Sequence, residues 1–224
     1  MRALLIFLIT AAASAEPLPQ ADIYIIGERH GYAPHYAEQA AIVAEVQPKA
    51  VVFEQLTDEQ ADRIAPETPR DLQVFDRLLD WSDSGWPALE FYFPIMTASE
   101  AVIVGAAGAP GDLSAYGLDM LLDPDEQAAR ETLQLDAHCG TLPPERLPQF
   151  VARQRETDAQ FAARTLSALE TYGGPVVLIT GNGHAREDWG VPAAIARVRP
   201  DLRVLSLVQE GGSADGGDPC AAFR

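Results

Sequence analysis

The chain has 224 residues, 47% of them hydrophobic, and a formal net charge of -17 at pH 7. This length suits one domain with a substantial core and leaves little room for a second. The strong negative charge argues against binding to nucleic acids or to anionic membrane surfaces.

The amino-terminal segment has the pattern of a secretory signal peptide. A basic start, Met1-Arg2, precedes an apolar run from Ala3 to Ile9 and the small-x-small tripeptide Ala13-Ser14-Ala15. The run falls short of the ~20 residues that span a bilayer, so we expect cleavage after residues 1–15 and no transmembrane segment in the mature chain. No cysteine stands directly after the cleavage site. The sequence therefore predicts a periplasmic or secreted protein without a lipid anchor.

The two cysteines, Cys139 and Cys220, are expected to meet in that oxidising compartment. A Cys139–Cys220 disulfide would tie a flexible tail at 211–224, rich in glycine and aspartate, to a single domain at 21–210. Closing so long a loop is worth about 4 kcal/mol in the chain-entropy model. The alternative is a pair of free thiols, one of them a ligand beside His138.

Short apolar runs alternate with helix-like segments along the chain. This alternation predicts an α/β fold, with a mainly parallel sheet, helices on both faces and a site at the carboxyl ends of the strands. The predicted strands are Ala21–Ile26, Ala50–Phe53, Ala101–Val104, Pro175–Thr180 and Leu202–Val208. The predicted helical regions are His35–Gln47, Thr57–Glu100 with proline interruptions, Pro124–Asp136, Pro144–Glu170 and Val191–Val198.

Polar side chains follow three of the predicted strands. Glu28 and His30 follow the first, Glu54 stands just past the second, and His184 and Arg186 follow the fourth. Two imidazoles and a carboxylate suit a divalent transition metal such as Mn, Co or Zn, or acid–base work on water. We therefore expect Glu28, His30, Glu54 and His184 to be catalytic if the protein is an enzyme, with Arg186 steadying negative charge.

The longest predicted helix places Gln154 and Asp158 in the same stripe as its apolar residues. A carboxylate on an apolar face is costly unless it is paired or hydrogen-bonded. We expect Asp158, with Gln154, to orient a neighbouring side chain rather than to face solvent.

Several motifs together resemble the ChaN family of haem-binding, iron-uptake proteins, which is grouped with the Tiki metalloproteases and the erythromycin esterases. They are Gly27-Glu28-Arg29-His30, the distal Glu54, the pair Gln154…Asp158 and the run from Leu178 to Pro192 with its Gly-Asn-Gly-His184-Ala-Arg186 core. The similarity spans about Ala21 to Val208. The chain departs from the family in lacking a lipoprotein cysteine and in the glycines of the loop at 106–111.

The resemblance implies different functions through different branches. The ChaN branch implies an exported protein that binds haem for iron uptake, with a homodimer as one arrangement; candidate haem ligands are His30, Tyr32, His35 and Tyr36. The Tiki branch implies a metal held by His30, Glu54 and His184 and hydrolysis of peptides. The esterase branch implies a histidine and a glutamate acting as general base without metal.

Haem binding is the leading hypothesis because the whole-chain resemblance is nearest to ChaN. A metal-dependent peptidase or esterase is the alternative, and the residues considered alone would favour it. A purely structural polar network is the third possibility.

Overall fold

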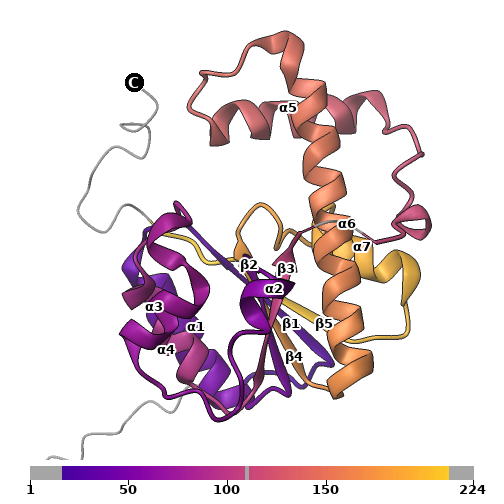
Figure 1. Cartoon of the computed structure of the whole chain (residues 1–224). Coiled ribbons are helices and arrows are strands. Elements are labelled where there is room, and N and C mark those ends of the chain that lie inside the picture. The colour runs from indigo at the N-terminus through magenta and orange to yellow at the C-terminus, as the bar shows by residue number, and fades with distance from the viewer. Residues whose placement is uncertain (1–16, 109–110, 212–224) are drawn as a thin grey trace, which may run out of the picture.

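A computed structural model describes residues 17–108 and 111–211 and contains an all-parallel sheet flanked by helices (Figure 1). The five strands run in the order β3-β2-β4-β1-β5. Their bounds are β1 (Ile23–Glu28), β2 (Ala50–Thr57), β3 (Val102–Ala107), β4 (Val176–Gly181) and β5 (Val204–Leu207). The predicted fold class is therefore confirmed.

Seven α-helices surround the sheet in the described part of the chain. They are α1 (Ala33–Val46), α2 (Asp58–Ala61), α3 (Leu72–Leu79), α4 (Leu89–Thr97), α5 (Pro124–Ala137), α6 (Leu147–Tyr172) and α7 (Val191–Val198). In Figure 1, α1, α3 and α4 cover one face of the sheet, while α6 and α7 cover the other.

The central strands are apolar along their whole length because both of their faces are covered. Every residue of β1 and β4 is buried. On the side of α1 and α4, Phe53 packs in one core with Tyr92; on the side of α6 and α7, Leu178 packs in a second core with Ile195. Full burial of each such apolar side chain contributes about 1.5–3 kcal/mol. The two cores fix the sheet between its helical layers.

The second strand continues beyond its predicted end. β2 runs to Thr57, and its register with β3 shifts between Phe53 and Thr57. The expectation that Glu54 lies just past the strand was therefore wrong, because Glu54 is inside β2 at this irregularity. The polar residues Glu54 and Gln55 made the strand seem to end at Phe53, but both side chains are buried within β2.

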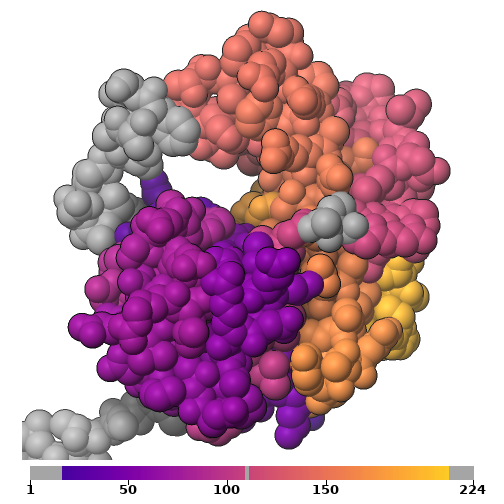
Figure 2. All heavy atoms as spheres, viewed as in Figure 1, coloured from indigo at the N-terminus to yellow at the C-terminus, as the bar shows by residue number. Residues whose placement is uncertain are grey.

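The long helix α6 carries part of the molecule beyond the sheet. Its 26 residues correspond to about 39 Å of helix at the usual rise, and its first half projects past the sheet and supports α5 (Figure 1). Asp123 caps α5, whose residues are all described and none fully buried. Figure 2 shows the molecule hollowed between α5 and the purple N-terminal helices.

The predicted signal peptide at 1–15 and Cys220 lie outside the described residues. The export signal and the Cys139–Cys220 disulfide therefore stay predictions, as do the domain limits. Within residues 17–108 and 111–211, no helix is both long enough and apolar enough to cross a bilayer.

Gly105 allows β3 to approach the end of β2 closely. A Cβ at this position would lie 2.2 Å from the carbonyl carbon of Thr57, which is backbone and cannot rotate away. We expect Gly105→Ala to lower the free energy of unfolding by about 1–3 kcal/mol, as measured by urea denaturation. Gly111→Ala is the control, because a Cβ there meets nothing within 4 Å. Equal stability of the two variants would contradict this close approach.

Candidate functional site

His30 lies between two carboxylates at the carboxyl edge of the sheet. Its Nδ1 is 2.7 Å from Glu28 Oε1, and its Nε2 is 3.2 Å from Glu54 Oε1. The imidazole is 42% exposed, whereas the side chains of Glu28 and Glu54 are 0% and 3% exposed. Water therefore reaches this cluster at the histidine. Trp86 packs edge-on against the same ring, at 5.2 Å between centroids.

Glu28 is satisfied by groups from two helices as well as by His30. Tyr92 in α4 donates a hydrogen bond of 2.6 Å to Oε1, and Gln39 in α1 donates one of 3.0 Å to Oε2. Burial and the negative charge of Glu28 both raise the pKa of Tyr92 well above its ordinary value, so this hydroxyl stays a donor. These contacts fix the Glu28 carboxylate at the end of β1.

Glu54 is held by β4. Its Oε2 accepts hydrogen bonds from the Thr180 hydroxyl and, at 3.0 Å, from the Gly181 amide. A Cβ on Gly181 would lie 3.1 Å from His30 Nε2, so the glycine leaves room for the imidazole. Oε1 is thereby directed at His30.

The protonation of His30 follows from these neighbours. Burial lowers the pKa of His30, but the hydrogen bond to Glu28 and the charges of Glu54 and Glu28 together outweigh burial. Its pKa is therefore raised above the ordinary 6.5. The cluster is arranged to hold a proton on the imidazole and to release it as the pH rises.

His184 forms a second pair with the buried Asp158 in α6. Its Nδ1 lies 2.7 Å from Asp158 Oδ1 and 2.9 Å from the side-chain nitrogen of Gln154. Asp158 is 2% exposed, and its Oδ2 has no hydrogen-bond partner among the described residues. A protonated Nδ1 donates to Asp158, which fixes the orientation of the ring.

The structure does not assemble the predicted metal site. His30 approaches Glu54, but Nδ1 of His184 is directed at Asp158. In the described ranges, no group of three or more histidine, cysteine, aspartate or glutamate side chains is placed to hold a metal ion. Arg186, predicted to steady negative charge, forms a bidentate pair with Asp188 at 2.9 and 2.6 Å.

Two of the predicted haem ligands are buried and engaged. His35 Nδ1 accepts a hydrogen bond from the Arg29 amide, and the Tyr36 hydroxyl accepts one from the Gly31 amide at 2.6 Å. Their side chains help to close the turn after β1. Tyr32 is half-buried and packs edge-on against His35. Among the four predicted ligands, His30 has the most accessible side chain.

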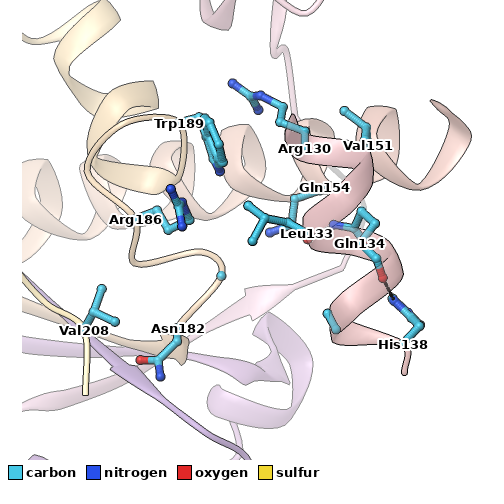
Figure 3. Close-up of a pocket in the computed structure, with 12 residues that line it drawn as sticks. Arg130, Leu133, Gln134, His138, Val151, Gln154, Asn182, Arg186, Trp189 and Val208 are labelled. Carbon is cyan, nitrogen blue, oxygen red and sulfur yellow. Dashed lines mark hydrogen bonds between the residues drawn. The ribbon is translucent and has the colours of Figure 1, made fainter. Parts of the chain in front are cut away.

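A separate cavity of about 370 Å³ lies between α5, α6 and the loop after β4 (Figure 3). α5 and α6 contribute apolar side chains together with Arg130 and polar groups, and the loop after β4 contributes asparagine, arginine and tryptophan side chains. The lining residues are Arg130, Leu133, Gln134, Ala137, His138, Val151, Gln154, Asn182, Gly183, Arg186, Trp189 and Val208. None of the four predicted haem ligands lines it.

Sequence reasoning missed most of this cavity. Leu133 and Arg130 lie on α5, where the spacing of apolar residues is too irregular to show which face of the helix is covered. Trp189 lies just outside the Gly-Asn-Gly-His motif. An aromatic residue five positions after His184 was the available signal. Gln154 is shared, because it lines the cavity and also contacts His184.

Part of the sequence is similar to a known protein family. Residues 105–195 match the model of the family described as haem-binding uptake, Tiki superfamily, ChaN. The chain is similar to this family over that segment. The matched segment contains every lining residue of the cavity except Val208, whereas Glu28, His30 and Glu54 lie outside it.

A solved structure, described as cofacial haem binding to ChaN of Campylobacter jejuni, has the same fold as this chain. The TM-score is 0.62 and the sequence identity 20%, over 82% of this chain and 79% of that chain. No curated protein matches the sequence.

The Asp158–His184 pair should make stability depend on pH. Burial raises the pKa of Asp158 from 3.8 to about 6, although the His184 hydrogen bond lowers it. Burial lowers the pKa of His184, but the hydrogen bond and charge of Asp158 raise it above 6.5. Both groups hold protons more tightly in the folded state than in the unfolded state. Stability is therefore highest below the unfolded-state values and falls as pH rises through the folded-state values.

We expect the urea midpoint to decrease as the pH is raised from about 4 to 8. Asp158→Asn should make this decrease smaller, because it removes one titrating group and also the carboxylate that raises the pKa of His184. Glu187→Gln, at an exposed position, is the control and should keep the slope of the wild type. A wild-type midpoint that rises over this range would contradict the assignment.

Proposed function

We propose that this chain binds haem in the cavity between α5, α6 and the loop after β4. The observation that carries this proposal is that the segment matching the haem-binding uptake family contains every residue that lines the cavity, apart from Val208. The polar cluster around His30 lies outside that segment.

The cavity fits the general chemistry of haem, which is a flat apolar macrocycle with two carboxylates on one edge. Leu133, Val151 and Val208 supply apolar wall, and Trp189 supplies an aromatic face. The volume of about 370 Å³ falls in the usual range for ligand sites. Leu133 is 37% exposed, so a ligand would bury apolar surface on α5 that the protein leaves open.

His138 is the histidine among the described lining residues. Its Nδ1 donates a hydrogen bond of 2.8 Å to the Gln134 carbonyl, which orients the ring at the edge of the cavity. Histidines that hold metals use this arrangement. His138 is therefore the first iron ligand to test, with His30 and Tyr32 kept from the sequence prediction.

We further propose that the protein is exported and takes part in haem or iron uptake. The signal-peptide pattern at residues 1–15 supports export to the periplasm or beyond. The family description supports a role in uptake. The Campylobacter jejuni structure is described as cofacial haem binding, and a homodimer formed on haem binding belongs to the same proposal.

Haemin titration tests the proposal. We expect the mature protein to give a saturable Soret shift, and Leu133→Glu to weaken binding at least about tenfold because it places a charge against the macrocycle. Leu121→Glu makes the same change at a side chain that is 97% exposed and outside this cavity, and should bind like the wild type. A wild-type spectrum identical to that of free haemin would overturn haem binding.

The cluster around His30 favours a second candidate function, hydrolysis of an ester or peptide. The observation is an accessible imidazole held between two buried carboxylates. In the imidazolium form Nδ1 donates to Glu28 and Nε2 donates to Glu54 Oε1, so loss of the Nε2 proton leaves a base at this edge. A water at this edge would meet a base, and Glu54 would stabilise the imidazolium that forms on proton transfer.

Hydrolysis of p-nitrophenyl acetate tests this candidate. We expect the rate to rise with pH as His30 loses its proton above 6.5, and His30→Ala to lower the rate at least about a hundredfold. Glu59→Gln, an exposed change in α2, should leave the rate unchanged. Activity that survives a chelator would favour the metal-free mechanism, and loss of activity the metal-dependent one. A wild-type rate equal to that of the His30→Ala variant would remove the candidate.

A further inference from the structure

Trp189 is flanked by two guanidinium groups at one end of the cavity (Figure 3). The Cζ of Arg186 lies 4.3 Å from the centroid of the Trp189 ring, and the Cζ of Arg130 lies 5.0 Å from it. Arg186 and Trp189 belong to the loop after β4, whereas Arg130 belongs to α5. The cation–π contacts therefore join the two walls of the cavity.

Each arginine is oriented by an acidic residue on its own segment. Nε and Nη2 of Arg130 both bond Glu126, and the same two atoms of Arg186 bond Asp188. Among the described residues, neither Nη1 group makes a hydrogen bond to a protein atom. Since a guanidinium has five N–H donors in a planar fork, each arginine keeps donors for a further anion.

Two guanidinium groups converge on one ring in a chain whose net charge is -17, and each keeps N–H donors that its acidic partner does not use. The side chain of Arg130 is only 11% exposed, so solvent screens its charge poorly. Both arginines line the cavity together with the apolar side chains of Leu133 and Val151. An apolar surface that ends at paired cations matches an amphipathic anion.

We propose that Arg130, Trp189 and Arg186 form the carboxylate-recognition end of this cavity. The ligand class that they select is a flat apolar molecule with free carboxylates on one edge, such as a tetrapyrrole with unesterified propionates. This inference rests on the proposed haem-binding function and deepens it. It assigns recognition to the carboxylate edge of the ligand, independently of which residue holds the iron.

The test compares three probes on the mature protein in one buffer: haemin, haemin dimethyl ester and iron-free protoporphyrin IX. The wild type should bind haemin at least about tenfold more tightly than the ester, because esterification removes the charge that the arginines recognise. Protoporphyrin IX should show the same dependence on the arginines as haemin, since its carboxylates are intact and it has no iron to ligate. Quenching of tryptophan fluorescence reports binding of all three probes.

The variants are Arg186→Leu, Arg130→Leu and Arg186→Lys. Each leucine variant should weaken binding of haemin and protoporphyrin about tenfold and leave the ester almost unchanged, while Arg186→Lys should restore part of the loss by keeping the charge. Arg153→Leu makes the same change at an exposed position of α6 and should bind like the wild type. Circular dichroism confirms that each variant is folded.

The outcomes separate the two proposals. If the wild type binds none of the probes, the haem-binding function fails. If it binds haemin and the ester equally, or if the leucine variants keep the preference for haemin, the function stands and the arginine assignment is overturned. A dependence on the arginines that appears with haemin but not with protoporphyrin IX also overturns it, because the arginines would then act through the iron.

Discussion

The burial of two carboxylates at the edge of one sheet is the constraint on which the rest of this structure depends. An unpaired carboxylate in an apolar interior would cost several kcal/mol. Glu28 and Glu54 therefore need hydrogen-bond donors from the neighbouring helices and strands. Glu28 takes its donors from α1 and α4, and Glu54 takes its own from β4. His30 bridges the two acids. The same hydrogen bonds that make these charges tolerable also fix one helical layer against the sheet.

The loop after β4 links this polar cluster to the cavity. Gly181, the last residue of β4, donates to Glu54, and Asn182 and Gly183 of the loop then line the cavity. His184 turns back to Asp158 on α6, and Trp189 contacts Arg130 on α5. A single stretch of chain therefore supports an acid–base cluster on one side and a ligand cavity on the other. Substitutions in this loop can affect both sites, whereas Leu133 on α5 belongs to the cavity and His30, in the turn after β1, belongs to the polar cluster.

The sequence predicted the parts of the molecule that depend on local pattern. Continuous apolar runs identified the parallel strands, and Glu28 and His30 were expected at the end of the first one. The position of Glu54 was misjudged, because a buried polar pair inside a strand imitates a strand end; only the pairing of β2 with β3 and β4 resolves it. Tyr36 was predicted as a haem ligand, but its hydroxyl is buried beside that of Tyr92, which is distant in the sequence. No pattern near Tyr36 in the sequence indicates this burial. The cavity was missed for the same reason, since it depends on how α5 packs on α6.

The position of α5 also determines how a large flat molecule can enter. None of its residues, all of which are described, is fully buried, and it packs on the part of α6 that extends beyond the sheet. Segments with few buried apolar contacts open locally at a small fraction of the free energy of global unfolding. α5 can therefore swing away while both cores of the sheet stay intact. For the proposed haem site, the wall that encloses the ligand would then also be its entrance, and local opening of α5 rather than unfolding of the domain would admit it.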